Sequence, residues 1–468
     1  MSLSESTPHS SEELHTADSN YQGIRLGRNV VEKSEFGFHA EHTVSDSDQS
    51  ICYDDEGHLM TVAPTGKGKG VCSVIPTLLE YPGSVIVFDP KGENYQVTVN
   101  RRKELGQRVV VLNPFQILCD ETDSLNPLDL LQLPGADIES DAQMLASMLS
   151  SEGGFSKDPF WDISGSAILS GIIAHLASWD DEPKRTLNQL HQWMHQDDVA
   201  YQLAVLLDTC GKQMNQFAYR EIAAFLQHPE RETRPSVQST AASYLKCLAG
   251  GRVPDVLKHS SFSLEEFVNG EPVSIYIIIP PNKLKSHRGL FRLLIGTLLA
   301  AVMTRENRPM YDTLFLVDEA AQLKQFTMLE QALTLCRGYG LKVWSFWQDL
   351  AQLKTYYPES WRTLMNNCDI KQIYGISSLF QARDWGTILE RSPEELLKIA
   401  PTQQLLVMPN GDEIITEKLN YLHDADYQRL ALPNPRYTDF VRERKRPEKL
   451  SRPVKPGTDE TNEEVKSR

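Results

Sequence analysis

Short runs of β-branched and aliphatic residues, bounded by turn-forming residues, recur along most of the chain. We predict buried strands at residues 59–63, 84–89, 108–113, 273–279, 313–318, 342–347, 371–374 and 405–408. Apolar residues with helical spacing lie between several of these runs and predict helices at residues 71–80, 290–305 and 328–337. Alternating strands and helices are typical of an α/β domain built around a mainly parallel sheet.

The pattern changes between residues 136 and 258, where helical spacing continues without a strand-like run. We predict helices there at residues 141–150, 163–178, 186–195, 198–209, 214–227 and 236–248. Strand-like runs resume at residue 273. The sequence therefore predicts an all-α domain at 136–258, inserted into a nucleotide-binding α/β domain made of residues 23–135 and 259–433.

Both ends of the chain are polar. Residues 1–22 and 434–468 contain too few apolar residues to build a core, so we expect a disordered leader and a disordered tail. The first 20 residues lack the apolar segment of a signal peptide. The most apolar helical stretches, 163–179 and 293–303, fall short of the roughly 20 apolar residues of a membrane-spanning helix. We therefore expect a cytoplasmic protein.

The composition is that of an ordinary soluble protein, with 40% hydrophobic and 24% charged residues. Its 7 cysteines form no CxxC pair, so the sequence indicates neither a disulfide framework nor a zinc site. The formal net charge over 468 residues is -16, from 47 Lys and Arg against 63 Asp and Glu. This balance excludes a protein that coats nucleic acid with its whole surface, but it leaves room for a local basic channel.

The clearest motif is the octapeptide Ala-Pro-Thr-Gly-Lys-Gly-Lys-Gly at 63–70, between a predicted strand and a predicted helix. This is the context of a P-loop, in which backbone N–H groups and the helix N-terminus hold phosphate oxygens. Lys69 would contact the β- and γ-phosphates of ATP. The other residues expected to bind the nucleotide are Thr65, Gly66, Lys67, Gly68, Gly70 and Val71. A lysine-rich surface turn is the alternative.

Two positions depart from the usual P-loop pattern. Ala63 replaces the first glycine, and Gly70 replaces the serine or threonine that ligates Mg²⁺. A water molecule or a nearby hydroxyl would have to supply the missing ligand, and Ser73 is a weak candidate for it.

The second motif is Thr-Leu-Phe-Leu-Val-Asp-Glu at 313–319, a buried strand that ends in two acidic residues. It matches a Walker B element, in which Asp318 holds Mg²⁺, directly or through water, and Glu319 activates the attacking water. Alone the pattern is weak, because many strands end in acidic residues. An upstream P-loop makes it strong.

Two residues downstream are further candidates. Gln348 ends the strand predicted at 342–347, where an amide can hydrogen-bond the γ-phosphate or its water. Arg337 ends the helix predicted at 328–337. It could be an arginine finger, which ring ATPases often supply to a neighbouring subunit, or simply a cation that stabilises a helix C-terminus. The residues alone do not decide between these two.

The segment Asp-Pro-Lys-Gly-Glu at 89–93 follows the second predicted strand. It would lie at the carboxyl end of the sheet, where open α/β domains bind ligands. An ordinary polar turn is the alternative.

These motifs together resemble the type IV secretion coupling proteins, the hexameric conjugation ATPases of the TraG/TraD type. The most specific segment is Tyr-Pro-Gly-Ser-Val-Ile-Val-Phe-Asp-Pro-Lys-Gly-Glu-Asn at 81–94, beside the Gly-Lys-Gly of the P-loop. The resemblance runs from about residue 23 to about residue 430. It also includes residues 23–28, 58–71, 75–79, 126–129, 157–161, 316–320, 337–340 and 348–353.

The resemblance implies a RecA-like motor domain with an inserted all-α domain, assembled as a homohexameric ring that binds ATP and Mg²⁺ between subunits. It favours Arg337 as a finger that reaches the neighbour's γ-phosphate, and Gln348 as a sensor. Glycine after the P-loop lysine is usual in this family, so Gly70 is compatible with ATP binding. The all-α domain would recognise cargo.

The implied partners are single-stranded DNA or a relaxase-DNA complex, and components of a type IV secretion channel. Family members commonly begin with a transmembrane segment, but almost nothing apolar precedes residue 23 here, so we expect either a soluble fragment or a membrane-free variant. Attachment at the inner membrane would then need a partner protein. We interpret the chain as an ATP-driven coupling protein for conjugation. The alternatives are a nucleotide-gated scaffold that recruits cargo with little turnover, and a DNA-pumping ATPase outside secretion.

Overall fold

The computed structural model describes residues 21–30, 50–150, 158–179 and 182–437. Contacts divide the chain into two units, Met1–Leu432 and Pro433–Arg468, and the fold below is that of the first. Most of the predicted leader (1–22) and tail (434–468) lies outside the described residues.

The centre of the fold is a mixed sheet. Its strands are β1 (Ile24–Asn29), β2 (Ser50–Tyr53), β3 (His58–Val62), β4 (Val85–Phe88), β5 (Arg108–Leu112), β6 (Val273–Ile277), β7 (Thr313–Val317), β8 (Leu341–Trp347), β9 (Cys368–Ile373), β10 (Gln403–Val407) and β11 (Glu413–Glu417). Their spatial order is β2-β1-β11-β10-β9-β3-β8-β7-β4-β6-β5. From β9 to β5 in this order the neighbours run parallel, and from β2 to β9 they run antiparallel. Each predicted strand is present, whereas β1, β2 and β11 were not predicted.

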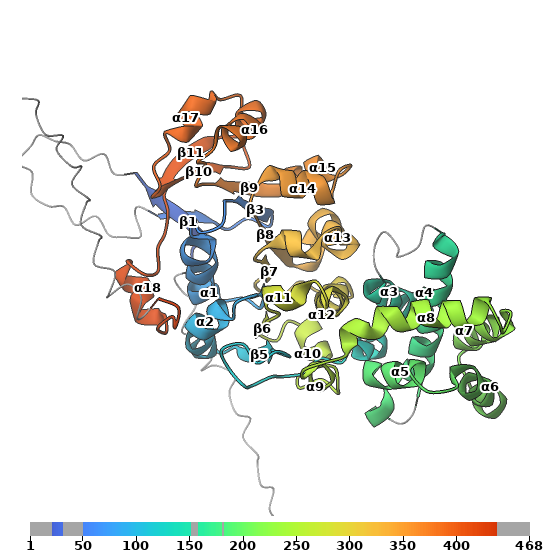
Figure 1. Cartoon of the computed structure of the whole chain (residues 1–468). Coiled ribbons are helices and arrows are strands. Elements are labelled where there is room, and N and C mark those ends of the chain that lie inside the picture. Colours follow the sequence, from blue (N-terminus) through green and yellow to red (C-terminus); the bar gives the residue numbers. More distant parts are fainter. Residues whose placement is uncertain (1–20, 31–49, 151–157, 180–181, 438–468) are drawn as a thin grey trace, which may run out of the picture. The chain divides into compact units, whose positions relative to one another are not determined.

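Helices cover both faces of this sheet (Figure 1). On one face lie α1 (Ile75–Glu80), α2 (Glu93–Glu104) and α18 (Ala425–Leu430); on the other lie α12 (Arg288–Met303), α13 (Thr327–Leu335), α14 (Leu350–Tyr356) and α15 (Trp361–Asn366). Every residue of β3, β4, β6, β7 and β8 is buried. Burial on both faces explains why these strands are continuous apolar runs rather than alternating ones.

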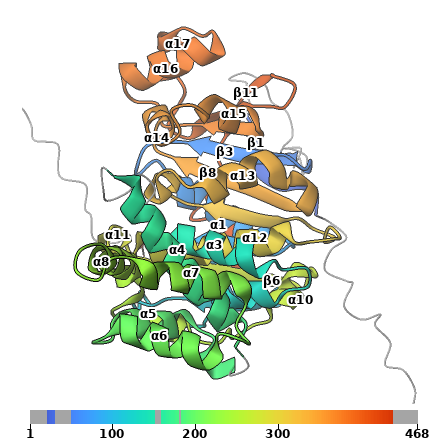
Figure 2. The same cartoon turned by 90° about the vertical axis from the view of Figure 1, so that its right-hand side faces the viewer.

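Between β5 and β6 the described residues form helices, turns and loops but no strand. The α-helices are α3 (Ile138–Leu149), α4 (Pro159–Ala177), α5 (Leu187–Met194), α6 (Val199–Cys210), α7 (Gln216–Gln227), α8 (Thr233–Leu245), α9 (Val253–Val256) and α10 (Leu264–Val268), and the 3-10 helices are η3 (Pro127–Gln132), η4 (Glu182–Lys184) and η5 (Lys246–Leu248). Helix α4 packs against α3, α7 and α8, and α3 packs against α12 on the face of the sheet that α12 covers, which is turned toward the viewer in Figure 2. Whether residues 136–258 fold as a separate domain stays a prediction.

Short helices complete the unit. They are α11 (Pro281–Leu284) after β6, and α16 (Leu379–Leu389) and α17 (Pro393–Leu397) between β9 and β10. A π-helical turn, η2 (Gly70–Val74), precedes α1, and two 3-10 turns, η6 (Ala320–Leu323) and η7 (Cys336–Tyr339), flank α13.

Helix α4 corrects one expectation. It has 19 residues and is apolar enough to cross a membrane by length and composition, although the sequence suggested that no stretch reaches that length. In the structure 61% of its apolar window is buried, and the helix lies among α3, α7 and α8. A core helix in a helical bundle passes the same test, so its composition is accounted for by packing.

His58 gives the fold a pH-dependent contact. Its Nδ1 accepts a hydrogen bond of 3.1 Å from the backbone N–H of Val343, which joins β3 to β8. Burial, together with the positive charge of Arg337, lowers the pKa of His58 from 6.5 to about 4. The neutral ring is therefore the form that stabilises the folded chain.

Replacing His58 with asparagine should make the pH dependence of stability shallower. The unfolded chain takes up a proton here near pH 6.5 and the folded chain only near pH 4. Within this range the unfolding free energy of the wild type falls by about 1.4 kcal/mol for each unit by which the pH is lowered. Asparagine does not titrate, so the variant has no such loss at this position. Unfolding free energies of both proteins at pH 7 and 5 should converge as the pH falls. If the difference in unfolding free energy between wild type and variant is the same at pH 7 and pH 5, the neutral His58 ring does not stabilise the fold in this way.

Candidate functional site

The predicted site residues follow three adjacent strands. The P-loop follows β3, Asp318 and Glu319 follow β7, and Gln348 follows β8. The sheet order β3-β8-β7 places these strands side by side and parallel, so their carboxyl ends share one edge of the sheet. Ligands of open α/β sheets bind at this edge.

The P-loop backbone adopts conformations that need glycine. Gly66 and Gly68 have φ values of 78° and 96°, in the left-handed region. The loop closes through a hydrogen bond from the Lys67 N–H to the Pro64 carbonyl, and Thr65 and Gly66 are exposed. Thr65 and the Gly66 amide are thus open to a ligand.

After the loop, Gly70 and Val71 begin η2. The backbone N–H of Cys72 donates to the Gly68 carbonyl at 2.7 Å, which continues the loop into the helix. The weak magnesium candidate Ser73 is buried, and its hydroxyl donates to Gln372 Oε1 at 3.0 Å. In this arrangement Ser73 is directed toward β9 and does not replace the hydroxyl missing at Gly70.

Lys69 lies within the loop, buried, with its ammonium directed toward the acidic residues. Its Nζ donates to the Ala63 carbonyl at 2.8 Å and lies 3.9 Å from Glu319 Oε1. Burial lowers the pKa of Lys69, while the charges of Glu319 and Asp318 oppose this shift. The cation is therefore placed where the phosphates of a nucleotide bound to the loop would lie.

Glu319 is held by two contacts and by its backbone. Besides Lys69, its Oε2 accepts a hydrogen bond of 2.7 Å from Gln348 Nε2. Its φ and ψ of 63° and 55° are left-handed, which is uncommon for a residue other than glycine. Strain of this kind costs of order 1–3 kcal/mol and clusters at active sites.

Asp318 has an unused oxygen that could face a metal ion. Its Oδ1 is buried without a hydrogen-bond partner. Burial raises the pKa of Asp318 to about 6, and the charge of Glu319 adds to the effect. Among the described residues no group of three or more His, Cys, Asp or Glu could hold a metal alone. The arrangement fits Mg²⁺, which commonly takes one or two carboxylates together with water and substrate phosphates.

Asp89 is a further buried carboxyl at this edge. It follows β4, beside β7, and its Oδ2 accepts a hydrogen bond of 2.9 Å from the Tyr95 N–H. Burial raises the pKa of Asp89 to about 7, and the negative charge of Asp318 contributes to the rise. The 89–93 segment thus belongs to the same edge, but Asp89 also holds the start of α2.

Arg337 lies at the opposite edge of the sheet. It belongs to η7, just before β8, whereas Gln348 follows the far end of that strand. Seven strand residues separate them by roughly 20 Å. Arg337 is 43% exposed, and its guanidinium pairs with Asp369 at 2.9 Å. The structure does not bring Arg337 together with Lys69, Glu319 and Gln348 of the same chain.

Lys418 contacts the P-loop without having been predicted. It follows β11, donates to the Lys67 carbonyl at 3.3 Å and lies over the Tyr374 ring at 4.8 Å. Gly375 lies beneath the side chain of Lys67, where any β-carbon would come within 2.6 Å of it. No local pattern could have identified Lys418, because the strand before it was itself missed.

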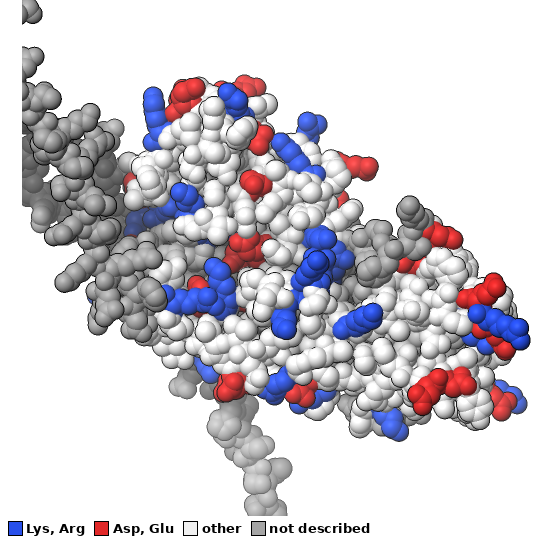
Figure 3. Space-filling model, viewed as in Figure 1, with Lys and Arg blue, Asp and Glu red and all other residues white. Residues whose placement is uncertain are grey.

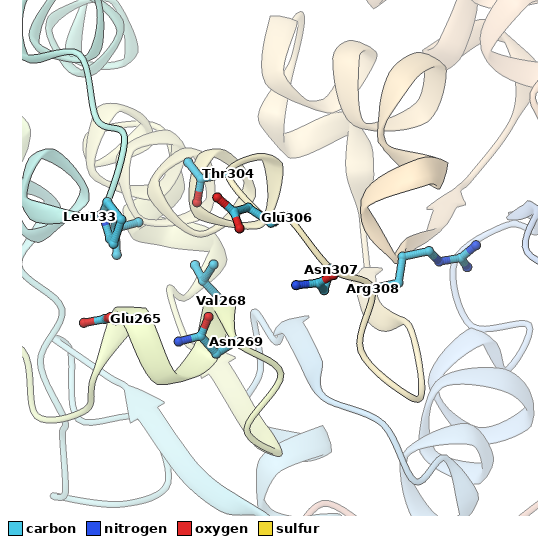
Figure 4. A pocket seen from close by; sticks show the side chains of 9 residues that line it. Leu133, Glu265, Val268, Asn269, Thr304, Glu306, Asn307 and Arg308 are labelled. Atoms are coloured by element: carbon cyan, nitrogen blue, oxygen red, sulfur yellow. The ribbon is translucent and has the colours of Figure 1, made fainter.

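A hollow near the end of α12 lies away from these residues (Figure 4). Its lining includes Val268, Asn269, Thr304, Glu306 and Arg308. These residues precede β6 and β7, so they lie toward the amino ends of the strands. The hollow is therefore not part of the P-loop site.

A family model described as type IV secretory system conjugative DNA transfer matches residues 10–379. The chain is 30% identical over 347 residues to a conjugal transfer protein TraG of Escherichia coli, covering 68% of this chain and 52% of that protein. It is 25% identical over 406 residues to the type IV secretion system-coupling protein VirD4 of Bartonella quintana (strain Toulouse), covering 84% of this chain and 60% of that protein. The chain thus spans about half the length of these relatives.

Solved structures share the fold. The conjugative coupling protein TrwB, in a fragment called TrwBdeltaN70 bound to sulphate, superposes with a TM-score of 0.60 at 16% identity and covers 85% of this chain and 94% of that one. TrwB with ADP and Mg²⁺ gives a TM-score of 0.59 at 16% identity, covering 85% and 95%. VirB4 of Thermoanaerobacter pseudethanolicus gives 0.56 at 14% identity, covering 87% and 98%. The predicted fold class, an α/β P-loop motor, is confirmed.

Proposed function

The chain belongs to the type IV secretory system conjugative DNA transfer family, and we propose on this basis that it is an ATP-hydrolysing coupling protein. It would recruit relaxase-DNA or protein cargo to a type IV secretion channel and help to drive its translocation. The observation that carries the proposal is the contact of Glu319 with both Lys69 and Gln348 at the carboxyl edge of the sheet. This set unites a phosphate-binding cation, a general base and an amide that can sense the γ-phosphate.

Nucleotide binding would use the P-loop. The exposed Gly66 amide and the start of η2 would hold the phosphates, and Lys69 would exchange its bond to the Ala63 carbonyl for phosphate oxygens. Because Lys69 already lies beside Glu319, the γ-phosphate would enter between them. Binding of ATP would thereby change the contact that Glu319 makes with the P-loop.

Hydrolysis would use Glu319 as the base that takes a proton from the attacking water. Gln348 would hold the carboxylate in place, and its position at the end of β8 would carry the presence of the γ-phosphate to α14. Asp318 would hold Mg²⁺ through its unpaired Oδ1, directly or through water. When bound, the ion would neutralise charge on the β- and γ-phosphate oxygens.

The catalytic set of one chain would be incomplete without a second copy. Arg337 lies at the opposite edge of the sheet, so it could reach a nucleotide only in a neighbouring subunit. A head-to-tail contact of this kind generates a ring when the rotation closes. We infer the homohexamer that the sequence resemblance implies. Helices α3–α9 would recognise cargo.

ATP hydrolysis by the full chain should rise several-fold when single-stranded DNA is added. A motor couples ATP hydrolysis to movement along the DNA strand, whereas a scaffold that only recruits cargo needs no ATP hydrolysis. Phosphate release should be measured with and without an oligonucleotide, with Lys69→Ala as the background. Lys103→Ala is the matched control, because this exposed lysine lies on α2, outside the P-loop. An assembled ring that hydrolyses no ATP would support the scaffold and contradict the motor.

A further inference from the structure

Four cationic side chains gather at the carboxyl ends of β6 and β7. Lys283 and Lys285 lie at the end of α11, Arg288 is the first residue of α12, and Lys324 directly follows η6. The positive charges of Arg288, Arg292 and Lys285 lower the pKa of Lys324, so three separate segments share one electrostatic neighbourhood. The four residues Lys283, Lys285, Arg288 and Lys324 are called the basic cluster below.

The basic cluster is not neutralised within the described part of the chain. None of its members forms an ion pair with an acidic residue there, whereas Arg308, Arg337 and Arg391 each do. Figure 3 shows Lys and Arg side chains gathered over α11, the start of α12 and α13, on the face that also carries the carboxyl edge of the sheet. In a chain with a net charge of -16, like charges kept together without counter-charges favour an anionic ligand.

The loop that carries Lys324 is held rigidly. Buried Arg292 donates to the Leu323 carbonyl at 3.0 Å and to the Gln325 carbonyl, so it fixes the residues on both sides of Lys324. Lys324 itself has a φ of 56°, which is uncommon outside glycine. One turn before Arg292, the Nε of Arg288 is buried without a partner. The backbone on both sides of Lys324 is thus fixed, whereas Lys283 and Lys285 are exposed at the end of α11.

The chemistry of the cluster selects among anionic partners. Segments 281–288 and 320–325 carry no exposed large apolar side chain, as a membrane contact or the core of a protein interface would need. The one aromatic ring of these two segments, that of His287, packs edge-on against Phe115 and is not fully exposed for a base to stack on. Lysine and arginine side chains are suited to bind a phosphate backbone, because this contact does not depend on the base sequence.

We propose that the basic cluster binds the phosphate backbone of the DNA strand that this protein moves. The inference rests on the proposed function and adds the contact surface. Lys324 lies five residues after Glu319, and Arg292 ties this loop to α12. A displacement of the loop when the state of the nucleotide changes would therefore be transmitted to the bound strand. The same connection would let DNA binding alter the position of Glu319.

Salt-dependent binding of a fluorescent single-stranded oligonucleotide to the full chain tests the cluster. The double variant Lys285→Gln/Lys324→Gln should bind more weakly and reduce the slope of log K against log salt by about 1.4, or 0.7 for each lost contact. Lys103→Gln/Lys398→Gln removes the same charge from exposed positions elsewhere and should match the wild type. Thermal unfolding of both variants verifies the fold.

Three results would overturn the proposal. A double variant with wild-type affinity and slope, while the wild type binds DNA, would reject the cluster and leave the proposed function standing. A wild type that binds no DNA would reject DNA as the cargo and with it the cluster. Binding to vesicles of phosphatidylcholine and phosphatidylglycerol that depends on Lys285 and Lys324, with DNA binding unaffected, would assign the surface to a membrane.

Discussion

Replacing Glu319 with glutamine is expected to lower kcat for ATP hydrolysis by about 10²–10⁴-fold. The amide cannot take a proton from water, although it keeps the length and shape of the side chain. Gln348 Nε2 can still donate to the amide oxygen at the place where it now meets Oε2 at 2.7 Å. Backbone strain at this position, with φ near 63°, is shared by both residues and cancels in the comparison. Turnover should be measured at saturating ATP, together with the Kd for ATP.

The Kd for ATP should change little, because the P-loop and Lys69 are intact in this variant. Removing the charge beside Lys69 should, if anything, favour the phosphates, since the ammonium loses a competing carboxylate 3.9 Å away. Glu330→Gln is the matched control, on helix α13 of the same face, and should keep the wild-type rate. A Glu319→Gln variant with a normal kcat would assign the base to another residue.

The P-loop and the Walker B strand could be predicted because local sequence determines both. Strands buried on both faces must be continuous apolar runs, as at β4 and β7. Gly66 and Gly68 mark backbone conformations that only glycine adopts readily. The sequence also placed Glu319 and Gln348 directly after two strands. The parallel pairing of β7 with β8 brings these two side chains within hydrogen-bond distance.

The antiparallel part of the sheet could not be predicted for equally physical reasons. Strand β11 is only partly buried and ends in charged residues, so its apolar signal is weak. Strand β1 contains Gly27, because the side chains of Gln404 and Thr416 lie against its backbone and leave no room for a side chain there. It also carries arginines that form ion pairs outside the sheet, so its apolar pattern is interrupted. Helix α2 was not predicted for a similar reason. It is mostly polar, and its buried face includes Arg102, whose charge interrupts the apolar pattern expected of such a face.

The basic cluster shows a further limit of sequence reasoning. The net charge suggested only that cations must be local if DNA is bound. Lys285 and Lys324 are 39 positions apart, and their proximity depends on how Arg292 fastens the loop after β7 to α12. Contacts of this kind arise from tertiary packing and leave no pattern along the chain.

Replacing Arg337 with alanine is expected to lower kcat by about 10³–10⁵-fold if it is an arginine finger. The guanidinium would stabilise charge that develops on the γ-phosphate during transfer. Within one chain it lies at the amino ends of the strands and pairs with Asp369, whose Oδ2 also accepts a hydrogen bond from the Tyr53 hydroxyl at 2.8 Å. The finger would have to leave this pair to enter the neighbouring site.

That pair supplies the control that separates catalysis from structure. If Arg337 served only to neutralise Asp369, then Asp369→Asn should remove the need for it and Arg337→Ala/Asp369→Asn should be active. If Arg337 is a finger, Asp369→Asn alone should keep its activity and the double variant should stay inactive. Arg308→Ala provides a second control, because this arginine lies before β7, as Arg337 lies before β8, and pairs with Asp312 and Glu56.

Mixing inactive subunits decides whether Arg337 acts on the neighbour. A Lys69→Ala subunit retains its finger but cannot hold phosphate, and an Arg337→Ala subunit retains its P-loop but has no finger. In a mixed ring, some interfaces would join an intact P-loop to an intact finger, so part of the activity should return. No such interface arises if Arg337 serves its own chain, because each subunit then carries one defect of its own. Mixed rings with no activity above the two parents, despite exchange of subunits, would therefore place the role of Arg337 within its own chain.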